Sequence, residues 1–113
     1  MLYPNDANGD ALRRMEAQGD DLTKPRNIDF TVVFVDASSA EQFAEHFRVL
    51  GQKVSVALTG TDPAFPWDVV VVEHMVPSYD GITSFENLLQ SVADGWGGHN
   101  DGWGCFSEPP SAS

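Results

Sequence analysis

The sequence predicts an α+β protein of the ferredoxin-like βαββαβ class, with a four-stranded sheet, helices on one face and an extra N-terminal helix. Segments with a period of two and segments at helical spacing follow one another as helix, strand, helix, strand, strand, helix, strand. Strand–helix–strand units prefer right-handed crossovers, and two such units give a split four-stranded sheet. A length of 113 residues fits one domain with a single modest core.

The N-terminal segment predicts a short helix. Residues 8–19 place Leu12 and Met15 three positions apart, with Asn8 or Asp10 as a candidate N-cap. A turn-rich segment follows and leads into the first strand.

The next two segments predict a strand followed by a helix. Residues 28–37 alternate, so that one face is apolar and the other carries Asp29. Residues 38–51 repeat apolar side chains at helical spacing, and Ser38 with Glu41 forms a capping-box pattern.

The second half predicts a hairpin and a third helix. Residues 53–59 alternate as a strand does, and residues 67–76 contain four consecutive valines, which are typical of a central strand buried on both faces. Residues 82–96 form an amphipathic helical pattern, with Thr83 and Glu86 in capping-box positions.

Residues 95–106, GWGGHNDGWGCF, hold two of the three tryptophans, five of the ten glycines and the only cysteine. A phosphate-binding loop needs glycines between a strand and a following helix. Here the helix precedes the glycines and a short strand is expected at residues 103–107. Residues 95–98 are therefore predicted to end the helix and turn the chain. Residues 101–104 are predicted to form an acidic turn that carries Trp103.

Charge is distributed unevenly along the chain. Residues 1–53 carry nine acids and all six Lys and Arg residues, whereas residues 54–113 carry eight acids and no Lys or Arg. Direct nucleic-acid binding is not expected, because it needs clustered basic residues, and the field favours basic partners. The alternative interpretation is that the net charge of −11 only keeps the protein soluble. No apolar run is long enough for a membrane span and no export signal is visible, so a cytoplasmic location without membrane contact is expected.

The candidate chemical groups do not form a recognised catalytic or metal motif. His99, Asp101 and Cys105 have acceptable ligand types, but their spacing matches no known zinc pattern. No Lys or Arg follows Lys53 to lower the pKa of Cys105, and a buried cysteine in an edge strand is the simpler interpretation. We expect no catalytic residue, no metal and no cofactor.

Two pairs of carboxylates also fail to predict an acid–base site. Asp20 and Asp21 are adjacent in a loop, where solvated or capping roles are expected. Asp68 and Glu73 are an odd number of residues apart on one strand and therefore face opposite sides.

The DGWG of residues 101–104, followed by Cys105-Phe106 and Glu108-Pro109, resembles the C-terminal signature of the ribonuclease E inhibitor RraB family. The resemblance extends over residues 8–109 and includes Gly19-Asp20-Asp21-Leu22, Pro25-Arg26, Asp29-Phe30, Phe43-Ala44 and Gly51. It implies a single ferredoxin-like domain without catalysis, flanked by flexible ends at residues 1–7 and 110–113. It also implies binding to the scaffold portion of an RNA-degrading endonuclease, which damps RNA decay.

We therefore predict a non-enzymatic regulator that binds ribonuclease E, or another protein with a basic segment, through an acidic surface. The predicted partner-binding residues are Asp101, Gly102, Trp103, Gly104, Trp67, Asp68, Glu73 and Glu108, and the predicted structural motif is Asp20, Asp21, Pro25, Arg26, Asp29 and Phe30. One alternative is a small metal- or cysteine-dependent enzyme that uses His99, Asp101 and Cys105. Another is a dimeric ligand-sensing ferredoxin-like module, and a homodimer is left open.

Overall fold

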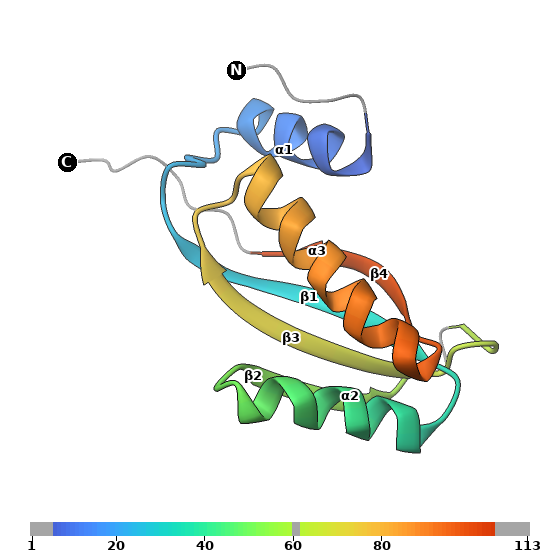
Figure 1. Cartoon of the computed structure of the whole chain (residues 1–113). Coiled ribbons are helices and arrows are strands. Elements are labelled where there is room, and N and C mark those ends of the chain that lie inside the picture. The colour runs from blue at the N-terminus through green and yellow to red at the C-terminus, as the bar shows by residue number, and fades with distance from the viewer. Residues whose placement is uncertain (1–5, 60–61, 106–113) are drawn as a thin grey trace.

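A four-stranded antiparallel sheet organises the computed structural model, which describes residues 6–59 and 62–105 (Figure 1). The strand order is β2-β3-β1-β4, and each neighbouring pair is antiparallel. The strands are β1 (Arg26–Phe34), β2 (Lys53–Leu58), β3 (Trp67–Met75) and β4 (His99–Gly104). The helices are α1 (Ala7–Ala17), α2 (Ala37–Val49) and α3 (Tyr79–Ala93), followed by the 3-10 helix η1 (Asp94–Trp96). This order and topology confirm the predicted α+β class.

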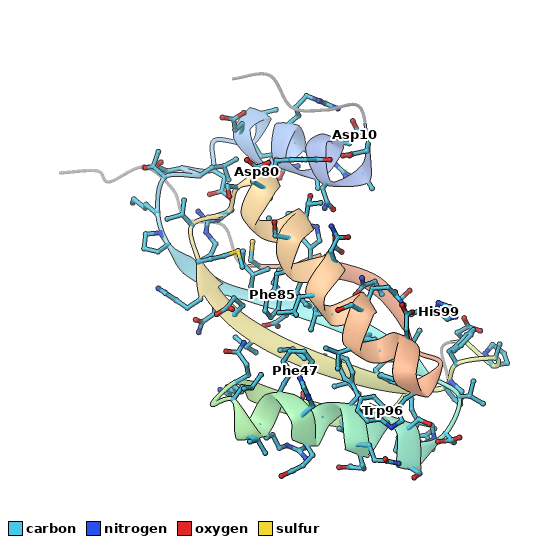
Figure 2. The ribbon with its side chains drawn as sticks, viewed as in Figure 1. Asp10, Phe47, Asp80, Phe85, Trp96 and His99 are labelled. Carbon is cyan, nitrogen blue, oxygen red and sulfur yellow. The ribbon has the colours of Figure 1, made fainter. Side chains whose placement is uncertain are left out.

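The core lies between the sheet and the two helices that cover one of its faces. Figure 1 shows α2 and α3 on this face, with α1 packed beside the start of α3. Alternate strand residues point into this layer, and Figure 2 shows Phe47 of α2 and Phe85 of α3 directed into it. The fully buried large side chains are Phe30, Phe34, Phe43, Phe47, Leu12, Ile28, Ile82, Leu89, Val32, Val69 and Val71.

The opposite face of the sheet is not covered by any helix of the described residues. In β3, Val69 and Val71 face the helices and are fully buried, whereas Val70 and Val72 face the other way and are only half-buried. The prediction that the valine run is buried on both faces is therefore wrong. β3 is central in the sheet, but the sheet has one open face.

All three helices begin before the residues that the sequence predicts as caps. Each observed N-cap accepts a hydrogen bond from the backbone N–H three residues later: Asp6 from Gly9, Asp36 from Ser39, and Ser78 from Gly81. The predicted capping residues Asn8, Asp10, Ser38, Glu41, Thr83 and Glu86 lie inside the helices. Several short polar side chains could serve as caps, and the point at which the chain leaves the extended conformation selects among them.

The glycines at residues 95–98 end α3, as predicted. Gly97 has a φ of +71°, and the N–H of Gly98 bonds to the carbonyl of Ala93 at 3.0 Å. A Cβ on Gly98 would lie only 2.3 Å from the ring of Phe34, so this position also needs glycine for packing. Among the helices of residues 6–59 and 62–105, none is long and apolar enough to cross a membrane.

Candidate functional site

β4 contains a β-bulge within the DGWG sequence. Two residues of β4, Asp101 and Gly102, stand opposite the single residue Thr31 of β1. Gly102 has a φ of +104°, which L side chains rarely adopt. The predicted acidic turn at residues 101–104 is therefore wrong. The segment is an edge strand that begins earlier than predicted and contains one inserted residue.

The bulge turns Trp103 toward the helices. In a regular strand, His99 and Trp103 would share a face because they are four residues apart. The inserted residue shifts the alternation by one, so that Trp103 pairs with Phe30 on the helix face. The indole is half-buried against the core, and its Nε1 donates a hydrogen bond of 2.9 Å to Oδ1 of Asn8.

Asn8 joins three elements through its side-chain amide. Its Oδ1 accepts from Trp103, and its Nδ2 donates to Oγ1 of Thr83 at 3.0 Å and to Oε1 of Glu86 at 2.8 Å. Thr83 and Glu86 thus hold α1 on α3 instead of capping α3. Leu12 of α1 is fully buried in the same core cluster as Ile82 of α3. The DGWG sequence therefore helps to dock the N-terminal helix.

Asp20 and Arg26 form a buried ion pair at the start of β1. Nη1 of Arg26 lies 2.9 Å from Oδ2 of Asp20, and the two side chains are 3% and 2% exposed. Burial alone would lower the pKa of Arg26, but the hydrogen bond and charge of Asp20 outweigh it and raise the pKa. The predicted solvated or capping role is wrong for Asp20. It is right for Asp21, whose Oδ1 accepts from the N–H of Thr23 at 3.1 Å.

The structure does not gather His99, Asp101 and Cys105 into one site. His99 makes an edge-to-face contact with Phe65 at 5.0 Å, and Figure 2 shows it at the start of β4, next to the β2–β3 loop. Cys105 packs against the core, where burial raises the pKa of its thiol and Arg26 only partly offsets that rise. In the described part of the chain, no three His, Cys, Asp or Glu side chains are placed to hold a metal ion.

A groove of about 650 Å³ lies on the open face of the sheet, along β1 and β4. It is lined by Asn27, Asp29, Thr31, Lys53, Val72, Asp101, Gly102, Trp103, Gly104 and Cys105. Within the described residues, the side chains of Asp29, Asp101 and Lys53 form no hydrogen bond or ion pair. The groove thus offers two free carboxylates and one free ammonium group.

The remaining predicted partner-binding residues are divided between the two faces. Asp68 is on the open face and accepts a hydrogen bond of 3.2 Å from Oγ1 of Thr59. Trp67 and Glu73 pair with helix-facing residues of β1 and so lie on the covered face. Glu108 lies outside the described residues.

The groove also contains residues that were not predicted to bind a partner. Asp29 was assigned to a structural motif, and Lys53 was not assigned at all. The sequence did contain one indication that Asp29 lies on this face. The alternation of β1 places Asp29 and Thr31 on the side opposite its apolar face. The sequence alone could not show that β4 pairs beside them.

Comparison with known proteins agrees with the sequence motifs. A family model described as "RraB: Regulator of ribonuclease activity B" matches residues 5–105, a range that includes every described helix and strand. A search of curated proteins found no match. The family match covers most of the 113 residues, including the Asp20–Arg26 ion pair and the β4 bulge. The chain therefore belongs to the RraB family, the regulators of ribonuclease activity B.

Proposed function

We propose that this protein is a non-catalytic regulator of a ribonuclease that binds a basic segment of its partner through the open face of its sheet. The observation that carries the proposal is the charge of that face. Its strands present Asp29, Asp68 and Asp101, and Lys53 is the one Lys or Arg side chain that the described strand residues place there. An acidic face of this kind attracts a basic segment and repels RNA.

Ribonuclease E, or another RNA-degrading enzyme with an arginine-rich segment, has the chemistry that fits this face. A basic segment that normally holds RNA phosphates would be occupied by the regulator, so RNA decay would slow. A non-catalytic role is proposed because, among the described residues, His99, Asp101 and Cys105 do not form a metal-binding group, and burial raises the pKa of the Cys105 thiol.

Fluorescence anisotropy with a labelled eight-residue peptide of alternating arginine and serine tests the proposal. We expect salt-sensitive binding to the wild type and loss of about tenfold in affinity when Asp29, Asp68 and Asp101 are all changed to Asn. The matched control changes Glu16→Gln, Glu45→Gln and Asp80→Asn, which removes the same charge from exposed helix positions. The control should bind nearly as well as the wild type.

The same proteins should be added to purified ribonuclease E during cleavage of an RNA substrate. The wild type and the helix control should slow cleavage, and the open-face variant should slow it much less. Equal effects of the two variants, or no binding of any basic peptide by the wild type, would contradict the proposed function.

A further inference from the structure

Gly104 lines the groove, and the described residues give no conformational or packing reason for a glycine there. Its φ is not positive, and a Cβ added to it would meet no atom within 4 Å. Gly98 and Gly102 differ, because Phe34 crowds the first and a positive φ requires the second. Gly104 is the last residue of β4, and a glycine in a strand can mark the close approach of another backbone. Gly104 therefore leaves space that the described residues do not fill.

The surroundings of Gly104 indicate what kind of group would fill that space. Gly104 pairs with Asp29, and Asp101 lies on the same strand at the groove wall. Val72 provides an apolar neighbour beyond Asp29, and Lys53 is the next residue across the sheet. Lys53 is two strand spacings from Asp29, or roughly 10 Å at the backbone. The end of the groove nearest Gly104 is therefore the anionic end.

We infer that a short extended segment of a protein partner lies in this groove, with its backbone over Gly104 and an arginine side chain between Asp29 and Asp101. This inference rests on the proposed function and specifies where on the open face the partner segment binds. An extended segment fits because the groove follows β1 from Asn27 to Thr31 and β4 beside it. Arginine fits because its planar guanidinium carries five N–H donors, which two carboxylates can share.

Filling the groove without changing its charge tests this placement. Gly104→Val adds a β-branched side chain to a strand position with free space, so stability should be unchanged or higher. We expect it to weaken binding of the arginine–serine peptide by at least about tenfold. Ala57→Val is the matched control, because it adds bulk to an exposed β2 position on the same face, and it should change affinity by less than about twofold.

The contribution of Asp29 and Asp101 to peptide binding can be distinguished from the effect of the general charge of the open face. Asp29→Asn and Asp101→Asn should each weaken the arginine peptide more than Asp68→Asn does, although all three remove one charge from the open face. The wild type should also bind the arginine peptide more tightly than the same peptide with lysine, because an ammonium group cannot form a planar two-carboxylate contact.

The outcomes distinguish this inference from the proposed function. If the peptide binds the wild type and Gly104→Val equally well, the groove assignment is overturned and the proposed function stands. If no basic peptide binds the wild type, the proposed function fails and the groove assignment fails with it. If the amide NMR signals of Gly104 and Asp29 shift with protein concentration in the absence of peptide, a second copy occupies the groove and the inference is overturned.

Discussion

The extra residue at Gly102 changes which face of the sheet the following side chains occupy. Asn100 and Trp103 both face the helices, although they are three positions apart and a regular strand would place them on opposite faces. Asn100 donates from Nδ2 to the carbonyl of Glu86 at 2.8 Å, and Trp103 donates to Asn8. One glycine thus allows β4 to bond with both α3 and α1.

We predict that Gly102→Ala lowers the free energy of unfolding by about 1–2 kcal/mol, because an L side chain is strained at a φ of +104°. Gly104→Ala is the matched control on the same strand and should leave stability unchanged or slightly higher. Urea denaturation followed by circular dichroism measures both changes. Equal losses for the two variants would contradict the role given to the bulge.

We predict that breaking the buried ion pair between Asp20 and Arg26 is costly. Asp20→Asn or Arg26→Met alone should lower the free energy of unfolding by about 3–5 kcal/mol, because either change leaves one buried partner without its opposite charge. The double variant should lose less than the sum of the two single variants. A double-mutant cycle in urea provides the measurement, and additive losses would show that the pair is not coupled.

We predict that Cys105 reacts slowly with iodoacetamide at pH 7, because burial raises the pKa of its thiol and keeps it protonated. The rate should fall below that of glutathione at the same pH and rise steeply in alkaline solution. Mass spectrometry of the modified protein follows the reaction. Modification at pH 7 faster than that of glutathione would revive the cysteine-dependent enzyme as an alternative.

At the scale of an element, α1 is attached to the rest of the protein by a small number of contacts. Leu12 is its fully buried large side chain, and Met15 packs against the core beside it. Its polar attachments include the bonds of Asn8 and the hydrogen bond of 2.5 Å from the hydroxyl of Tyr79 to Oδ2 of Asp6. Asp6 also caps the helix by accepting from the N–H of Gly9. A single carboxylate therefore serves both the start of α1 and its docking onto α3.

We predict that the contact of α1 with α3 becomes weaker at acidic pH. The hydrogen bond from Tyr79, followed by that from Gly9, lowers the pKa of Asp6 below its ordinary value of 3.8. The charged carboxylate therefore contributes stability that is complete above that ordinary value and is lost as the pH falls through the lower folded value. Asp6→Asn keeps a side chain that can cap the helix but removes the charge. The stability of the contact between α1 and α3 should then depend less on pH in this range. The indole N–H signal of Trp103 in NMR spectra from pH 6 to pH 2.5 reports the change, and identical profiles for both proteins would contradict it.

At the scale of the whole molecule, a net charge of −11 acts against the compact state through repulsion among like charges. We predict that raising NaCl from about 20 to about 300 mM increases the free energy of unfolding, because screening weakens this repulsion over a Debye length. The same change should weaken binding of the arginine–serine peptide. Urea denaturation and anisotropy measure the two effects. A loss of stability with salt would mean that surface pairs such as Arg48 with Glu41 outweigh the repulsion.

The element order, the core face of β1 and the glycine termination of α3 could be predicted because they depend on local periodicity and backbone preference. The helix starts could not be predicted as well, because several polar residues near each start are acceptable caps. The candidate site could be predicted only in part. Asp101 and Gly104 were assigned to it, but Asp29 and Lys53 come from other strands and reach the groove through pairing.

The sequence by itself determined the α+β class, the acidic second half and the DGWG motif that carries the family resemblance. Only the tertiary structure decided that DGWG is a bulged edge strand, that Trp103 faces the helices and that Asp20 is buried against Arg26. The physical reason is that periodicity reports which residues share a face within one element. Strand register, bulges and ion pairs depend instead on which elements become neighbours, and that is decided by the packing of the whole chain.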